Sequence, residues 1–270
     1  MSFTFLSRDQ IAQKVPSALA ETHDGRRSDR YSFVRTLDIV DSMEAAGWGV
    51  VAAENPKARK SNSRDFGIHR LQFQSRSESN WLADPRSNSS NGRLYPRIHV
   101  LNSHNGTSRL TIHAGLYALV CTNGLVICNG SVGEINVRHN AGFSQFDANA
   151  AVQQFANDMP KLSEAIANWG KLQLNREQVA DLSTCAARIR WNKADDILPN
   201  VESIYAPRRM EDTQTDLWTV FNRVQENVIR GGYARDKRKA RPVSQIREDL
   251  RINQELWALA EAKFVEYSVN

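Results

Sequence analysis

Histidines are the residues in this sequence whose type and grouping most suggest chemistry. Four of them, His69, His99, His104 and His113, fall within one stretch of the N-terminal half, and clustered imidazoles can ligate a transition metal. No carboxylate, however, stands between residues 84 and 134, and ligand pairs at a fixed short spacing are lacking. We therefore expect histidines that pack or form hydrogen bonds, with no metal and no cofactor. A metal site on these four residues is the alternative.

Motifs of the common enzyme classes are missing from the sequence. It contains no GxxxxGK[ST] phosphate loop, no GxGxxG, no HExxH and no GxSxG. Glu261 and Lys263 resemble the carboxylate-x-lysine end of a nuclease motif, but they fall in a stretch typical of a terminal helix and lack a paired aspartate on an upstream strand. We therefore expect no catalytic residues, and a metal-dependent nuclease is a minor alternative.

Positive charge is concentrated in two blocks of the sequence. The whole chain has 35 Lys and Arg against 30 Asp and Glu, a formal charge of +5. Residues 55–113 carry ten cations against three acids, and residues 228–251 carry eight against three, so the remaining chain is acidic. Clustering of this kind is typical of proteins that bind polyanions, because each neutralised phosphate releases counterions.

The two blocks supply the expected contacts to nucleic acid. Cations that we expect to touch phosphates are Lys57, Arg59, Lys60, Arg64 and Arg70 in the first block, and Arg230, Arg235, Lys237, Arg238, Lys239 and Arg241 in the second. Tyr233 and Phe66 could stack on bases. A cationic groove with an aromatic platform holds single strands without sequence preference. No helix-turn-helix, zinc-finger or RRM signature accompanies it, so base-specific readout is not expected.

The elements that position these residues change in character along the chain. Residues 29–36, 48–53, 66–73 and 134–138 alternate as strands do, and residues 37–46 have helical spacing closed by Gly47. Residues 97–102 and 108–113 flank Asn105-Gly106, a strong hairpin signal. Residues 114–124 are apolar, and we expect a buried helix there. Ser7 and Gln10 form a capping box for a first short helix that Pro16 should stop.

The second half of the sequence has a helical pattern. Helices are expected over residues 152–191, interrupted at Pro160, and over 216–229 and 243–267. The fold class is therefore α+β, with an antiparallel sheet and helices in the N-terminal half and a helical C-terminal half. We expect an α+β core with basic loops over residues 1–142 and a helical region packed on it over 143–270.

Location follows from features that the sequence lacks. No apolar run reaches the ~20 residues that a membrane span needs, the first ten residues do not resemble a secretory signal, and three cysteines are too few for a disulfide framework. We therefore expect a cytoplasmic protein with no membrane partner.

Several segments resemble one known family. They are the turn NSHNGT at 102–107, AGLYALVCTNGLV at 114–126, RKARPVSQIREDLRINQELWALAE near the C-terminus, and SDRYSFVRT at 28–36. Together they resemble the phage- and plasmid-borne family catalogued as domain of unknown function nine-three-two, over nearly the whole chain. The resemblance implies origin on a mobile element such as a bacteriophage, and it supplies no chemistry.

A looser resemblance concerns topology. The order of helix, strand, helix ending at Gly47-Trp48 and antiparallel strands is similar to single-strand annealing proteins of the RAD-fifty-two class. That resemblance implies rings or filaments that bind single-stranded DNA in a basic groove. The long helical C-terminal half and the long basic loops of this chain depart from those proteins.

Taken together, these observations favour a non-enzymatic DNA-binding protein of a phage or plasmid. It would bind or anneal single-stranded DNA in recombination and would assemble as a homo-oligomer in the host-cell cytoplasm. An inhibitor of a host defence complex, of the anti-CRISPR or anti-restriction type, is the alternative from another class. Such an inhibitor would act by protein contact, because a chain of charge +5 does not mimic DNA.

Overall fold

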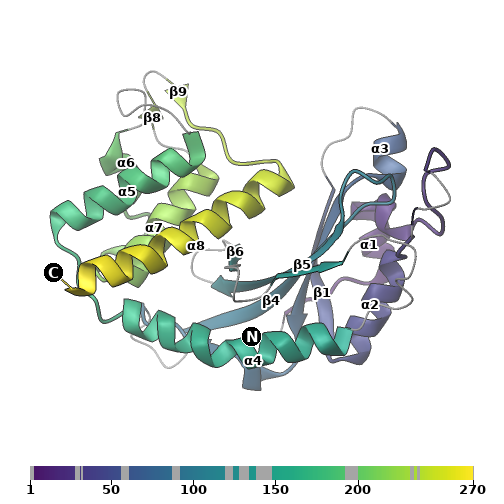
Figure 1. Cartoon of the computed structure of the whole chain (residues 1–270), viewed down its shortest axis with the longest axis horizontal. Coiled ribbons are helices and arrows are strands. Elements are labelled where there is room, and N and C mark those ends of the chain that lie inside the picture. Colours follow the sequence, from purple (N-terminus) through teal and green to yellow (C-terminus); the bar gives the residue numbers. More distant parts are fainter. Residues whose placement is uncertain are drawn as a thin grey trace. The chain divides into compact units, whose positions relative to one another are not determined.

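The structure is a computed structural model that describes residues 3–27, 31, 33–55, 61–86, 92–118, 124–127, 134–137, 148–191, 200–231, 234–235 and 238–269 (Figure 1). The chain forms two compact units, each assembled from separate stretches of sequence. The first unit contains Met1–Trp81, Tyr95–Tyr117 and Gly130–Asp158, and the second contains Leu82–Leu94, Ala118–Asn129 and Met159–Asn270. Whether residues 1–142 and 143–270 are domains remains a prediction.

The main sheet is built from the middle of the chain. Its strands are β1 (Trp48–Glu54), β2 (His69–Ser75), β3 (Leu82–Ala83), β4 (Arg93–Asn102), β5 (Leu110–Ala118), β6 (Gly124–Ile127) and β7 (Glu134–Val137). The strand order is β1-β2-β4-β5-β6, while β3 pairs with β4 and β7 with β5. The pairs β1–β2, β2–β4, β3–β4 and β5–β7 are antiparallel. The predicted α+β class, with an antiparallel sheet in the N-terminal half, is confirmed.

The two faces of this sheet differ sharply in chemistry. On the apolar face, Leu71 and Phe73 of β2 lie opposite Val100 and Ile98 of β4, and all four are buried. His69 belongs to this face and bonds to residues of the N-terminal helices, which shows which elements cover it. The alternate residues of the same strands form what we call the polar face: Arg70, Gln72 and Gln74 on β2, and Arg97 and His99 on β4.

Short helices belong to the same unit as the apolar face. They are α1 (Arg8–Lys14), η1 (Pro16–Leu19), α2 (Thr36–Ala45), α3 (Ser61–Phe66) and η2 (Glu78–Asn80). The predicted capping box forms, because the Ser7 side chain accepts from the Gln10 N–H and the Gln10 side chain accepts from the Ser7 N–H. Gly47, at φ +84°, follows the end of α2 in a conformation that glycine adopts readily.

The second unit is mainly helical. Its elements are α5 (Arg176–Trp191), α6 (Val201–Tyr205), η4 (Met210–Asp212), α7 (Leu217–Arg230) and α8 (Ile246–Val269), with a two-stranded sheet of β8 (Ala234–Arg235) and β9 (Arg238–Lys239); the division between the units falls within α4 (Ala148–Trp169). Helix α7 is buried along its whole length from Leu217 to Val228. Trp169, Trp218, Phe221 and Trp257 form the aromatic core beside it.

Three predicted elements are wrong. Residues 33–35 are not a strand. The Val34 carbonyl accepts a hydrogen bond from the Asn102 side chain instead of from a neighbouring strand. Residues 114–118 continue strand β5 rather than forming a helix, because a short apolar run is compatible with either. Helix α4 also passes through Pro160 without ending. Leu162, Ile166 and Trp169 follow at helical spacing and are buried, and this burial outweighs the ~3 kcal/mol that an internal proline costs.

Candidate nucleic-acid interface

The C-terminal basic block folds into a tight β-hairpin between α7 and α8. Ala234 pairs with Lys239 and Arg235 with Arg238, so that only residues 236 and 237 connect the two strands. Figure 1 shows β8 and β9 at one end of the helical unit. The backbone register thus places two arginine positions, Arg235 and Arg238, opposite each other in the ladder.

Glycine is required at the base of the hairpin. Gly231 caps α7 at φ +64°, and its N–H donates to the Asn227 carbonyl at 2.9 Å. A Cβ atom at this position would overlap the carbonyl of Ala240, on the returning strand. The Val243 N–H then donates to the Ile229 carbonyl at 2.8 Å. The two ends of the hairpin are thereby closed against the last turn of α7.

Two further arginines bind backbone carbonyls at this base. Arg190, near the end of α5, donates to the carbonyls of Val228 and Arg241. Arg208 donates to the Asn227 side chain at 2.5 Å and to the Gly231 carbonyl. Cations at a helix C-terminus are stabilised by the partial negative charge of its free carbonyls. The fold thus gathers cations at the C-terminus of α7, from segments far apart in sequence.

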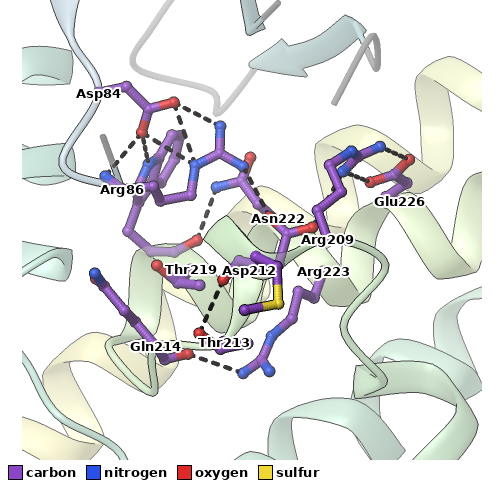
Figure 2. Close-up of polar contacts among 12 residues, drawn as sticks. Asp84, Arg86, Arg209, Asp212, Thr213, Gln214, Thr219, Asn222, Arg223 and Glu226 are labelled. Atoms are coloured by element: carbon purple, nitrogen blue, oxygen red, sulfur yellow. Dashed lines mark hydrogen bonds and ion pairs between the residues drawn. The ribbon is translucent and has the colours of Figure 1, made fainter. Parts of the chain in front are cut away.

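A chain of buried ion pairs anchors the start of the hairpin. Arg230 Nη1 lies 3.1 Å from Glu226 Oε1. Glu226 also receives two hydrogen bonds from Arg209, at 2.7 and 2.8 Å, which Figure 2 shows as a parallel pair. Arg209 in turn donates to Asp212 at 3.1 Å. The Glu226 side chain is only 2% exposed, so its charge depends on these partners.

The same chain of charges continues toward the start of α7. Arg86 lies 3.8 Å from Asp212 and makes a close pair with Asp84, whose carboxylate also accepts from the Trp218 indole N–H at 3.0 Å (Figure 2). Burial would raise the pKa of Asp84, but the hydrogen bonds and charge of Arg86, with the Trp218 bond, hold it below its ordinary value. The network therefore runs from Asp84 to Arg230; its carboxylates are buried, while Arg209 and Arg230 are partly exposed.

The histidines divide between the two faces of the sheet. The rings of His69 and His104 lie 5.2 Å apart, and both Nε2 atoms contact the Thr36 hydroxyl, at 2.9 and 3.1 Å. His99 lies on the opposite, polar face, close enough to His113 for their charges to interact. Within the described ranges, no three His, Cys, Asp or Glu side chains come together as metal ligands.

Hydrogen-bond chemistry assigns the protons around Thr36. The Asn102 amide donates to the Thr36 hydroxyl at 3.0 Å. The hydroxyl then has one lone pair and one hydrogen left for its contacts with the two imidazoles. His69 Nδ1 lies 3.0 Å from the Gly67 carbonyl, which only accepts, so Nδ1 carries a hydrogen. His69 Nε2 therefore accepts from Thr36, and His104 Nε2 donates to it. Both rings thus hold the Thr36 hydroxyl in place.

Comparison with known proteins decides the family. Residues 24–257 match the family described as Domain of unknown function (DUF932). The chain belongs to the DUF932 family. Two relatives from Escherichia coli strain K12 agree with this assignment: the UPF0380 proteins YafZ and YfjQ are each 30% identical to this chain, over 95% of its length and 91% and 90% of theirs. No solved structure matches the chain.

The expected DNA contacts of this DUF932 chain occupy different environments. Arg64 is exposed in α3 of the first unit, whereas Arg70 is buried and bound to Glu54 at 2.6 Å. Arg241 is exposed at the hairpin base. Arg235, Arg238 and Lys239 contribute backbone to β8 and β9, and Lys57, Arg59, Lys60, Tyr233 and Lys237 lie outside the described residues.

Sequence reasoning did not select Arg190 or Arg208 as cations of the interface, although both lie at the hairpin base. Neither stands in a basic block, and only the packing of α5 and the 206–212 segment against α7 brings them there. The nuclease-like pair is separated: Glu261 accepts from Trp257 at 2.9 Å, while Lys263 binds Asp181 and Glu266. Among the helices that the structure describes, none is both long and apolar enough to cross a membrane.

Proposed function

We propose that this DUF932 protein binds DNA through the basic hairpin of its helical unit, without enzymatic activity. The observation that carries the proposal is the backbone pairing of Arg235 with Arg238, which sets two arginine positions opposite each other in the β8–β9 ladder. Cations that contact a phosphate backbone release its counterions, and this release favours binding.

The surroundings of the hairpin support the same function. Arg190 and Arg208 bind backbone carbonyls at its base, and Arg230 pairs with buried Glu226, so the two ends of the hairpin are fixed against α7. A preorganised site loses less conformational entropy on binding than a flexible one. Arg64 belongs to the other unit, and the proposal therefore rests on the hairpin alone.

Single-stranded DNA is the expected substrate, and annealing during phage or plasmid recombination is the expected role. Tyr233 immediately precedes β8 in the sequence, and stacking on an aromatic ring requires unpaired bases. Annealing also calls for self-assembly, so a homo-oligomer belongs to this proposal. Inhibition of a host defence complex draws on no specific contact of the described residues and becomes an outcome of the test below.

The experiment compares the wild type with a triple variant, Lys237→Ala, Arg238→Ala and Lys239→Ala. Fluorescence anisotropy with labelled single- and double-stranded oligonucleotides over a salt series gives affinity and salt slope, and size analysis gives assembly. We expect the triple variant to bind at least tenfold more weakly for every sequence. Its log–log salt slope should be about 2 smaller, since each lost phosphate contact contributes roughly 0.7 on single strands.

A matched control removes three cations from the same unit. Lys161, Lys171 and Arg176 are exposed on and between α4 and α5, and their joint replacement by Ala changes net charge equally. This control should keep the wild-type affinity and slope. Equal weakening in both triple variants would mean that only net charge matters. No DNA binding at low salt would overturn the proposal and direct attention to capture of host proteins.

A further inference from the structure

The polar face of the main sheet is buried although its residues are hydrophilic. Arg70, Gln72, Gln74, Arg97 and His99 are each at most 8% exposed. The opposite face of the same two strands is filled by aliphatic and aromatic side chains. Burying polar groups is costly unless each finds a hydrogen-bond partner, so a polar buried face calls for an explanation beyond packing.

Hydrogen bonds orient the two glutamines of this face. Arg97 donates to the amide oxygens of both, at 3.0 Å to Gln72 and 3.3 Å to Gln74. Gln72 then donates from its nitrogen to Glu54 at 2.9 Å, and Glu54 also binds Arg70. Because the Gln74 amide oxygen is bound to Arg97, its amide nitrogen points away from Arg97. This nitrogen is buried and has no partner among the described residues.

His99 is a second unpartnered group beside it. Both ring nitrogens of His99 are buried and lack a hydrogen-bond partner in the described part of the chain. His99 faces Gln72 in the ladder, so it is the diagonal neighbour of Gln74, which faces Arg97. Side chains of diagonal neighbours can reach a common point when they are long. Two unused donors therefore lie next to each other on one face.

The electrostatic environment of His99 is positive. Burial is the main reason that its pKa falls well below the ordinary value, and the charges of Arg70 and Arg97 lower it further. An anion near the ring would be attracted by the same charges. A neutral imidazole can donate one hydrogen, and the Gln74 amide can donate two.

We propose that the polar face binds a phosphate-like oxyanion, with His99 and Gln74 as its hydrogen-bond donors. The chemical class is a tetrahedral phosphate, either free or as the phosphoryl group of a nucleotide. Tyr95 lies two residues before Arg97 on β4, next to Phe3, with ring centroids 4.7 Å apart. This site belongs to the first unit and is independent of the hairpin.

Titration of the full-length protein with inorganic phosphate tests the site. Calorimetry and thermal unfolding are measured in a phosphate-free buffer, with chloride at matched ionic strength as the control. Phosphate should bind saturably and raise Tm with concentration. Gln74→Met and His99→Phe should each weaken it at least tenfold, because each removes a hydrogen bond to a charged acceptor. Thr111→Val, a shape-matched change at a nearly buried position of β5, should leave affinity within twofold.

Further arms identify the source of the phosphate and exclude the hairpin. Stabilisation by inorganic phosphate indicates the free anion. Stabilisation by a nucleoside monophosphate, but not by the nucleoside or by phosphate, indicates a phosphoryl group. The hairpin triple variant should retain wild-type phosphate affinity whether or not it still binds DNA. Absence of binding to any of these ligands, or binding unchanged by Gln74→Met, overturns the proposal. If His99→Phe does not unfold cooperatively, it is not folded, and the phosphate affinity of Gln74→Met alone tests the proposal.

Discussion

At the scale of single residues, the Thr36 hydroxyl makes stability depend on pH. Protonation of His69 would place a third donor against this hydroxyl, which has two lone pairs and already accepts from Asn102 and His104. Burial, against a smaller opposing effect of the Gly67 carbonyl, lowers the pKa of His69 from 6.5 to about 4. Between pH 6.5 and pH 4, His69 is therefore protonated in the unfolded chain and neutral in the folded chain.

Stability should accordingly fall as pH decreases through that window. The expected loss from His69 is about 3 kcal/mol between pH 6.5 and 4, from the difference between the two pKa values. Urea unfolding of the wild type and of His69→Gln at several pH values measures it. The variant is less stable at pH 7, but its stability should change less on acidification. Equal slopes in the two proteins would contradict the proton assignment.

The sequence predicts which residues alternate, but not what covers them. Residues 66–73 and 97–102 switch between polar and apolar types, and that pattern correctly indicates two strands, which the structure places at His69–Ser75 and Arg93–Asn102. Alternation normally marks a solvent-facing polar side, whereas Gln74 and His99 are buried. Burial depends on segments distant in sequence, and therefore the polar face could not be found from the pattern. The division of the histidines between two faces was hidden for the same reason.

At the scale of elements, Gly231 controls whether the hairpin can form. Gly231→Ala forces a side chain into a left-handed conformation and against the Ala240 carbonyl. We expect a loss of about 1–3 kcal/mol in the free energy of unfolding and weaker DNA binding with the cations intact. Chemical denaturation and anisotropy check the two effects.

Gly25 provides the comparison for this change. A Cβ atom there would meet nothing within 4 Å, and its φ is not in the left-handed region, so Gly25→Ala should cost little. Wild-type stability and DNA affinity in Gly231→Ala would mean that the base of the hairpin is not closed as described.

Elements with a local signal were predictable, and elements decided by distant partners were not. The capping box at Ser7, the end of α2 at Gly47 and the Asn105-Gly106 hairpin depend on neighbouring residues alone, and all are present. Strand β5 beyond residue 113 and the passage of α4 through Pro160 depend on burial against other parts of the chain. The local sequence carries no information about that burial.

At the scale of the whole molecule, the buried ion chain should dominate the stability of the helical unit. Glu226→Gln removes the anion that Arg209 and Arg230 share. Arg209 and Arg230 are 25% and 36% exposed, and Arg209 keeps its bond to Asp212. We therefore expect a loss of about 1–3 kcal/mol in the free energy of unfolding, which urea unfolding measures. The exposed pair of Arg176 and Glu202, 3.8 Å apart, is the control. Arg176→Gln should change stability by less than about 1 kcal/mol.

The Asp84–Trp218 hydrogen bond joins residues 134 positions apart, and this separation matters while the protein is being synthesised. At a synthesis rate of ~5–20 residues per second, Asp84 is added to the chain roughly 7–27 s before Trp218. Arg86, two residues away, is added almost together with Asp84 and pairs with it at 2.6 Å in the folded protein. The partner that neutralises Asp84 is therefore local, whereas the indole that completes its site is made only with the last helices.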